Sequence, residues 1–202
     1  MSVELLTGGS GRLGTELLKL RSFDAPTHEE FDILDVLPRT YDLIVHSAAY
    51  INVARAETER RECFEANVLG TVNLLRQHNG RFVFISSEYA NNPVNYYSET
   101  KRAGELAVEA LSANGLIIRT LFKPNPFPFD RAFEDQFTQG DYVDVIAPLI
   151  VREIDEWDGE SKTVYVGTGR KTMFELAQRT RPDVKPNSIK DIKNVQIPAD
   201  YE

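Results

Sequence analysis

The 202-residue sequence has little of what marks disulfide-bonded, membrane or nucleic-acid-binding proteins. Its single cysteine, Cys63, allows no disulfide within the chain and suits a reducing compartment. No apolar run approaches a membrane span, and the acidic segment from Met1 to Leu6 does not resemble a signal peptide. Basic runs are missing, and 31 acidic against 23 basic residues give a net charge of −8, which disfavours nucleic acid and membrane surfaces as partners. We therefore expect a cytoplasmic protein.

Clustered metal ligands are also missing. The histidines His28, His46 and His78 are scattered, and neither cysteines nor carboxylates gather around them. Cys63 lies among charged residues in a helical pattern, which gives it no reactive surroundings. We expect neither a protein metal site nor a catalytic cysteine.

Apolar runs of strand length alternate with amphipathic runs of helix length over the first 120 residues. The strands are expected at 3–7, 43–46, 82–86 and 116–120, and helices at 13–20, 61–77 and 98–114. Strands separated by helices form a parallel sheet whose two faces are covered. The sequence therefore predicts an α/β fold with a doubly wound parallel sheet of the Rossmann type.

The pattern changes after Thr120. Prolines at 124, 126 and 128 predict an extended connector, because proline neither continues a helix nor fits a central strand. Further elements are expected as a helix at 143–157, a strand at 163–166 and a helix at 172–179, and residues 182–202 show no periodicity. We divide the chain into a Rossmann domain at 1–121 and a small dependent region at 122–202.

A glycine-rich loop joins the first expected strand to the first helix. Gly8, Gly11 and Gly14 are spaced by three, which allows a tight turn, close approach of a pyrophosphate and close packing of the helix on the sheet. The helix N-terminus adds free amides for phosphate. A flexible turn is the plainer alternative, but the strand-loop-helix context favours a dinucleotide site. Its expected residues are Gly8, Ser10, Gly11, Arg12, Leu13 and Gly14.

The choice between the two nicotinamide cofactors depends on the end of the second strand. An acid that would hold a ribose diol is not evident in residues 23–28, because Asp24 comes too early. Arg12 and His28 can accept a 2′-phosphate instead, although Arg12 can equally be a solvated helix residue. We expect NADP(H) in preference to NAD(H).

Tyr97 and Lys101 stand four residues apart at the start of a helix, on one face. A phenol of pKa ~10 is a poor acid at neutral pH, and a nearby ammonium with the cofactor's positive ring lowers that pKa. Ser86 and Ser87 end the preceding strand, where open parallel sheets bind ligands, so a hydroxyl there can bind a substrate carbonyl. An ordinary surface pair of tyrosine and lysine is the alternative.

These motifs stand in the order seen in extended short-chain dehydrogenases/reductases, a family that the sequence resembles from about residue 3 to residue 180. Within it, the sequence is most similar to the dTDP-4-dehydrorhamnose reductase branch. The similar segments are 30–35, 48–57, 86–89 and 135–137.

The resemblance implies a role for each matching residue. Tyr97 would donate a proton to the substrate oxygen, Lys101 would hold the nicotinamide ribose and tune Tyr97, and Ser87 would orient the carbonyl. Ser86 is either a further contact or a structural hydrogen-bonding residue. The implied cofactor groove is completed by Asp32 and Ile33 beside the adenine, by Ala48, Ala49 and Tyr50, and by Asn67, whose role is partly structural. Tyr96 is not the expected acid, since Thr100 stands four residues after it.

Keto reduction of a small-molecule ketone is the reaction that these parts imply. The resemblance points to a keto group on a nucleotide-linked deoxysugar as the substrate. Ser87 is followed by Glu88 and Tyr89 rather than by the acidic pair of a dehydratase, which favours reduction. Epimerisation with retained NAD and a non-catalytic, NAD(P)-binding regulatory role stay open. A homodimer is compatible with the sequence.

Two departures from the family concern the substrate side. Residues 88–96 form a much shorter loop between Ser87 and Tyr97 than relatives have, and the sequence stops after Glu202 where relatives continue. We therefore expect an open, pared-down substrate site, a small or differently held ketone, or a pocket completed by a partner chain.

Overall fold

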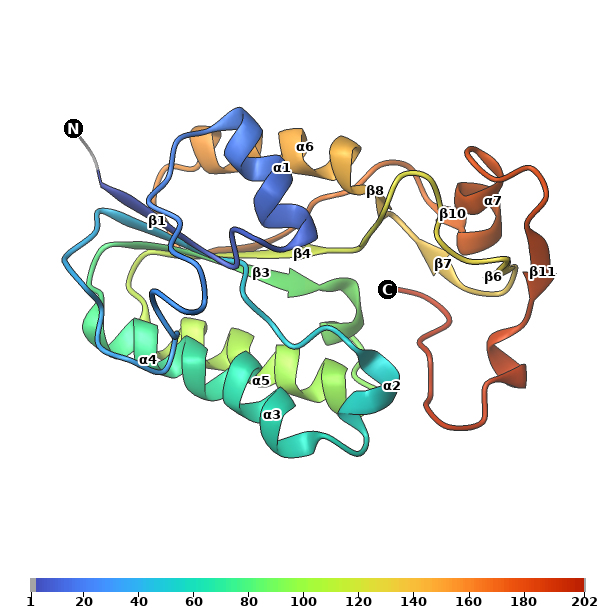
Figure 1. Cartoon of the computed structure of the whole chain (residues 1–202), viewed down its shortest axis with the longest axis horizontal. Coiled ribbons are helices and arrows are strands. Elements are labelled where there is room, and N and C mark those ends of the chain that lie inside the picture. Colours follow the sequence, from blue (N-terminus) through green and yellow to red (C-terminus); the bar gives the residue numbers. More distant parts are fainter. Residues whose placement is uncertain (1–2, 202) are drawn as a thin grey trace.

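A five-stranded parallel sheet forms the centre of the computed structural model, which describes residues 3–201 (Figure 1). Its order is β1-β2-β3-β4-β9, and every neighbouring pair is parallel. The first four strands are mostly buried because they are built from Leu, Ile, Val and Phe. The strands are β1 (Glu4–Thr7), β2 (Leu43–His46), β3 (Arg81–Ser87), β4 (Gly115–Thr120) and β9 (Lys162–Tyr165).

Helices cover both faces of this sheet, which confirms the doubly wound α/β fold (Figure 1). One face carries α1 (Arg12–Leu20) and α6 (Val143–Glu156), which pack on each other. The other carries α3 (Arg60–Phe64), a π-helical turn (Glu65–Leu69), α4 (Gly70–Gln77) and α5 (Tyr96–Leu111). A separate apolar cluster fills each side of the sheet, around Leu17 and Ile146 on one face and around Phe84 and Leu74 on the other.

The second Rossmann strand is reduced to one residue. Asp24 forms an isolated parallel bridge with Leu5, in which the Asp24 amide donates to Glu4 O at 2.8 Å and the Leu6 amide donates to Asp24 O at 2.9 Å. Residues 25–42 contain no helix or strand, and only a few of their apolar side chains, including Phe31 and Tyr41, reach the core. The sheet therefore begins in effect at β1.

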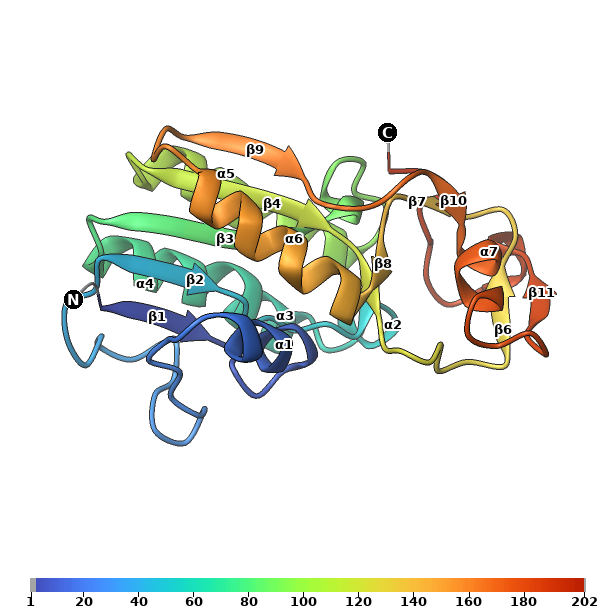
Figure 2. The ribbon, with the colours of Figure 1, turned by 90° about the horizontal axis from the view of Figure 1, so that it is seen from above.

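The chain beyond Thr120 forms a small lobe at the carboxyl ends of the parallel strands (Figure 2). It has its own apolar cluster, which includes Phe127, Tyr142 and Leu176. Its elements are α7 (Met173–Gln178) and the short strand pairs β5 (Phe122–Lys123) with β8 (Asp141–Tyr142), β6 (Arg131–Phe133) with β11 (Lys185–Asn187), and β7 (Phe137–Thr138) with β10 (Lys171–Thr172). Helix α6 and strand β9 also follow residue 121, yet they complete the central sheet layers.

The C-terminal segment packs back onto the short loop between β3 and α5. The Asn95 side chain donates to Gln196 O at 2.8 Å, the Asn91 side chain donates to Tyr201 O at 3.0 Å, and the Phe137 amide donates to Ala199 O at 2.8 Å. Although residues 182–202 show no periodicity in the sequence, β11 and a 3₁₀ turn at Ile189–Asp191 lie within them. None of the helices formed by residues 3–201 has the length and apolar character that crossing a membrane requires.

Candidate active site

The glycine loop lies between β1 and α1, beside the loop that follows β2. Gly8 has φ +72°, and a Cβ added there would stand 2.7 Å from the Ala48 amide nitrogen. A Cβ at Gly14 would stand 2.2 Å from Gly8 O. Both positions therefore need glycine, Gly8 for its backbone conformation and Gly14 for the close packing of α1 on the loop.

Two adjoining cavities follow this loop along the strand ends and share Gly8, Ser10, Ala48 and Ala49. We call the larger, of about 430 Å³, the strand-end cavity, and the other, of about 400 Å³, the loop cavity. Further residues of the strand-end cavity include Gly11, Arg12, Leu13, Ser86, Ser87, Tyr97, Lys101 and Lys123. The loop cavity includes His28, Asp32, Ile33, Glu62 and Glu65.

Tyr97 and Lys101 lie in the first turns of α5, which starts at a capping box. The Asn95 side chain accepts from the Ser98 amide, and the Ser98 hydroxyl accepts from the Asn95 amide. This cap fixes where the helix begins, so residues 97 and 101 face the ends of β3 and β4. Tyr97 is half-buried, and the Ser87 side chain is near enough to lower its pKa, which places the expected acid beside the expected carbonyl-binding hydroxyl.

The Lys101 ammonium is buried and lies against β3. Its Nζ donates to Ile85 O at 2.9 Å and stands 4.2 Å from the centre of the Phe84 ring. Burial lowers the pKa of Lys101 to about 8, and the charge of Glu105 acts in the opposite direction. Lys101 is thus a cation that titrates near physiological pH.

The pKa of Tyr97 is raised to about 12 rather than lowered, because burial disfavours the phenolate more than the hydrogen bond with Ser87 favours it. The expected lowering by Lys101 is not found, since its Nζ is directed at Ile85 O. At neutral pH the Tyr97 hydroxyl therefore carries its proton and can donate it.

Ser86 and Ser87 face different partners although they are adjacent. The Ser86 hydroxyl donates to Glu105 Oε1 at 2.6 Å, and the same carboxylate is paired with Arg119 at 2.7 Å. Ser86 lines the strand-end cavity, but its hydroxyl is committed to this buried network. Ser87 Oγ accepts from the Tyr89 amide at 3.2 Å and is the hydroxyl next to Tyr97.

Asn67 lies in a π-helical turn that interrupts the expected continuous helix 61–77. Its side-chain amide bonds the backbone N–H and C=O of Tyr50. Oδ1 accepts from the Tyr50 amide at 2.8 Å, and Nδ2 donates to Tyr50 O at 3.2 Å. Nδ2 also donates to Thr100 Oγ1 at 3.0 Å. Asn67 thereby holds the loop after β2, at Tyr50, against α5. Among the expected cofactor residues, Gly14, Tyr50 and Asn67 do not line either cavity.

The charged residues in and near the loop cavity bear on whether it suits a cofactor ribose with or without a 2′-phosphate. The Asp24 carboxylate accepts from Tyr41 OH at 2.8 Å and from Arg39 at 2.6 Å, so it is already bound by two side chains of the protein. His28 is exposed and lies 3.7 Å from Asp32. Asp32, Glu62 and Glu65 give this cavity three carboxylates.

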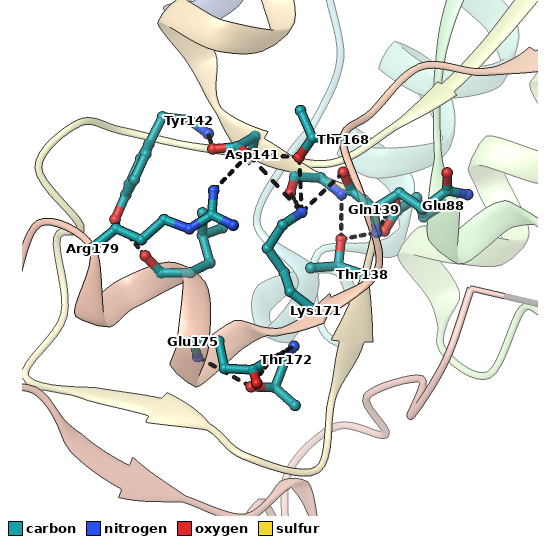
Figure 3. A network of polar contacts seen from close by, with 12 residues as sticks. Glu88, Thr138, Gln139, Asp141, Tyr142, Thr168, Lys171, Thr172, Glu175 and Arg179 are labelled. Carbon is teal, nitrogen blue, oxygen red and sulfur yellow. Dashed lines mark hydrogen bonds and ion pairs between the residues drawn. The ribbon is translucent and has the colours of Figure 1, made fainter.

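A buried polar network behind Ser87 joins the strand end to the C-terminal lobe (Figure 3). Glu88 is 3% exposed and accepts from Thr138 Oγ1 at 2.6 Å and from the Gln139 amide at 3.1 Å. Burial raises the pKa of Glu88. Lys171 Nζ donates to Gly140 O at 2.8 Å and lies 3.9 Å from Asp141, which is also paired with Arg179. This network sets the lobe's position relative to Ser87.

Several cavity residues escape the sequence analysis, notably Thr120, Phe122 and Lys123. Thr120 is buried, and its hydroxyl has no hydrogen-bond partner among the described residues. Lys123 lies between an aromatic residue and a proline, and a lone lysine in that apolar stretch was the only available signal. No group of three or more His, Cys, Asp or Glu within residues 3–201 is arranged to hold a metal.

Three of these observations fit a dinucleotide. Gly8 lets the loop pass close to Ala48 with a positive φ, Thr120 offers a buried hydroxyl without a hydrogen-bond partner among the described residues, and the lining of the strand-end cavity contains cations but no carboxylate. A cavity lined both by the glycine loop at a helix N-terminus and by a phenol, a hydroxyl and an ammonium suits a nicotinamide cofactor and a small carbonyl compound.

Comparison with known proteins agrees with this geometry. The family model of the RmlD substrate binding domain matches residues 1–148. A dTDP-4-keto-6-deoxy-D-glucose reductase of Streptomyces niveus is 31% identical, over 87% of this chain and 76% of its own length. A dTDP-4-dehydrorhamnose reductase of Aggregatibacter actinomycetemcomitans is 27% identical over 57% of this chain, and the match spans half of that relative.

A crystal structure shares the fold over nearly the whole chain. It is the dTDP-4-dehydrorhamnose reductase of Bacillus anthracis in complex with NADP, with a TM-score of 0.84 and 23% identity over 99% of this chain and 89% of that one. At this identity the likeness shows the fold.

Proposed function

The chain belongs to the RmlD substrate binding domain family, and we propose that it is an NAD(P)H-dependent reductase of a keto group on a nucleotide-linked deoxysugar. The single observation that carries the proposal is that Tyr97, Ser87 and Lys101 line the same cavity as the glycine loop. The relatives named as reductases of dTDP-linked keto sugars support the substrate class.

The proposed reaction uses the residues as the cavity presents them. A bound nicotinamide would supply the hydride for the carbonyl carbon. The Tyr97 hydroxyl, protonated at neutral pH, gives its proton to the carbonyl oxygen as negative charge develops there. Ser87, which lines the same cavity as Tyr97, would donate a hydrogen bond to the same oxygen. Lys101 Nζ, which donates to Ile85 O, would also hold the ribose hydroxyls of a bound cofactor.

For the cofactor we propose NADP(H) over NAD(H). Asp24 is bound by Arg39 and Tyr41 and is not free to hold a ribose diol, while Arg12 and His28 each border one of the two cavities. The three carboxylates of the loop cavity favour NAD(H) instead, because they repel a 2′-phosphate. Equilibrium titration distinguishes the two cofactors. We expect NADPH to bind at least ~10-fold more tightly than NADH, a difference of ~1.4 kcal/mol in binding free energy. Tighter binding of NADH would assign NADH instead.

We further propose residues 1–121, completed by α6 and β9, as the cofactor-binding part of the chain, and the lobe formed by the rest of 122–202 as the part that closes the substrate side. The short loop 88–96 is braced by the segment that contains Gln196 and Tyr201, so this chain supplies its own wall beside Tyr97. A homodimer stays a prediction, which light scattering of the purified protein would test.

Consumption of reduced cofactor with a panel of dTDP- and UDP-linked keto sugars tests the proposal. Tyr97→Phe is expected to lower the rate ~10²–10⁴-fold, as removal of a general acid does. Tyr96→Phe is the matched control, because Tyr96 stacks under Arg60 and does not line either cavity. Activity equal in the parent and Tyr97→Phe would remove Tyr97 from the reaction, and interconversion of sugars without net cofactor consumption would indicate an epimerase.

A further inference from the structure

Residues 196–201 form neither a helix nor a strand, and other parts of the chain hold this segment by its main-chain carbonyls (Figure 1). An extended segment cannot pair its own carbonyls, so the donors must come from elsewhere in the chain. They are Asn95 Nδ2 to Gln196 O at 2.8 Å, Gln136 Nε2 to Pro198 O at 3.4 Å, the Phe137 amide to Ala199 O at 2.8 Å, and Asn91 Nδ2 to Tyr201 O at 3.0 Å. These hydrogen bonds dock the 196–201 segment beside the short loop between β3 and α5.

Asn95 contacts two elements at once. Its residue is 5% exposed, and its Oδ1 accepts from the Ser98 amide at 2.9 Å, which caps α5. Its Nδ2 donates to Gln196 O, so one side chain joins the 196–201 segment to the first turn of the helix. Tyr97 lies two residues later and lines the strand-end cavity. The segment is therefore linked through a single side chain to the helical turn that carries the proposed proton donor.

The type of residue at position 95 matters for this link. A helix cap requires only a side-chain oxygen, which aspartate or serine supplies as well as asparagine does. Aspartate would add a favourable interaction of its charge with the helix N-terminus. Aspartate has no proton to donate at neutral pH, however, and the serine side chain is one atom shorter. The amide donor is thus the part of Asn95 that the cap does not need and that the bond to Gln196 O uses.

Two further donors to the segment also support the cavity. Gln136 Nε2 donates to Tyr89 OH at 2.6 Å, and Tyr89 lines the strand-end cavity. Asn91 Oδ1 accepts from Arg119 at 2.6 Å, and Arg119 is paired with Glu105 of α5. The segment itself lines neither cavity, so its effect on a ligand must pass through these neighbours.

We propose that Asn95 is a positioning residue, which uses its bond with the 196–201 segment to fix the first turn of α5 and thereby the Tyr97 hydroxyl in the strand-end cavity. The inference rests on the proposed function, in which that hydroxyl protonates the carbonyl oxygen. Proton transfer needs the two oxygens at hydrogen-bond distance, and a displacement of about 1 Å can cost ~10²-fold in rate. Loss of one anchor of the turn is expected to cost ~10-fold, because the cap and the rest of α5 stay in place.

Steady-state kinetics of the whole chain with a dTDP-linked keto sugar test this role. Asn95→Asp and Asn95→Ser each keep an acceptor for the Ser98 amide and remove the donor to Gln196 O. Both are expected to lower kcat ~10-fold and to leave the Kd of the reduced cofactor within ~3-fold of the parent, because the glycine loop belongs to β1 and α1 rather than to α5. A loss in Asn95→Asp alone would assign the effect to the added charge and overturn the proposal.

Two other asparagines of the same loop serve as matched controls. Asn92 is exposed, and its side chain has no hydrogen bond among the described residues, so Asn92→Asp adds the same charge nearby and should match the parent. Asn91→Asp keeps an acceptor for Arg119 and removes the donor to Tyr201 O, outside α5, so it should lower kcat less than ~3-fold. A loss as large as that of Asn95→Asp would contradict action through the start of α5.

Amide hydrogen exchange reports docking of the segment without any substrate. The Phe137 amide donates to Ala199 O, so it exchanges faster when the segment detaches. Both Asn95 variants should raise its exchange rate ~10-fold, or ~1.4 kcal/mol, which is the order of one hydrogen bond, and Asn92→Asp should not. If thermal unfolding shows that one Asn95 variant does not fold, Asn95→Thr, another capping residue, takes its place. Parental kcat in both Asn95 variants overturns the proposal.

The two measurements separate this inference from the proposed reaction. A parent that reduces no keto sugar, while Phe137 exchange responds to the Asn95 variants, would contradict the reductase and leave the link between Asn95 and the segment intact. A parent that reduces keto sugars, with both Asn95 variants at its kcat, would contradict the positioning role alone.

Discussion

Replacing Glu88 by alanine should destabilise the protein through the network that joins β3 to the C-terminal lobe. The carboxylate accepts from Thr138 Oγ1 at 2.6 Å and from the Gln139 amide at 3.1 Å, and Thr138 is fully buried. Each hydrogen bond to a charged group contributes about 1.5–3 kcal/mol. Removal of Glu88 also removes the free-energy cost of burying its carboxyl group, which offsets part of this loss. We expect a net loss of about 2–4 kcal/mol of unfolding free energy.

Thermal unfolding followed by circular dichroism measures this loss. For a chain of this size, about 2–4 °C per kcal/mol gives a decrease in Tm of about 4–16 °C. Glu88→Gln keeps the shape and one acceptor and should lose less than half as much. Glu175→Ala, at the exposed capping box of α7, should cost only about 1 kcal/mol. A Glu88→Ala protein as stable as its parent would refute the role given to this network.

Three further changes test other parts of the site. Gly8→Ala should weaken dinucleotide binding at least ~10-fold, because a Cβ would meet Ala48 N at 2.7 Å and φ is +72°. The control Gly159→Ala, at φ +95° in open space, should leave dinucleotide binding unchanged. Ser87→Ala should slow reduction ~10²-fold, while Ser86→Ala should chiefly lower Tm by breaking the hydrogen bond to Glu105. Equal effects of the two variants on the reduction rate would contradict the assignment of Ser87, rather than Ser86, as the carbonyl-binding hydroxyl. The reduction rate should be level below pH 7 and fall as pH rises through about 8, since Lys101 loses its proton there; a rate still rising at pH 9 would oppose this.

The sheet and its helices were predictable because their signals are local. β3 and β4 are continuous apolar runs, and the glycine loop, residues 8–11, stands directly between β1 and α1. The start of α5 follows from Asn95 and Ser98, which form a capping box within four residues. The positions of Tyr97, Lys101 and Ser87 near one another follow from these elements.

Other features depend on contacts between distant segments. Glu88 meets Thr138 fifty residues later, and neither residue shows a local pattern that announces the contact. The two-residue strands of the lobe are too short for a periodic signal. The second Rossmann strand was not predicted as a single bridge at Asp24, because one residue of pairing leaves no trace in hydropathy.

The raised pKa of Tyr97 could not be predicted from spacing alone. Residues four apart on a helix share a face, but the direction of the Lys101 ammonium depends on the carbonyl of Ile85 in a neighbouring strand. Burial of the phenol, which dominates its pKa, likewise comes from tertiary packing. The sequence therefore predicted that Tyr97, Ser87 and Lys101 lie at one cavity, but not the direction of the Lys101 ammonium or the burial of Tyr97.

The most direct test of the central claim is transfer of a labelled hydride. Reduced cofactor carrying deuterium at the transferred position, mixed with a dTDP-linked 4-keto-6-deoxy sugar, should give a product one mass unit heavier than the product from unlabelled cofactor, and Tyr97→Phe should give almost none. Mass spectrometry of the sugar reports this outcome. An unlabelled sugar recovered beside unconsumed cofactor, under conditions where the cofactor is bound, would contradict the proposed reduction.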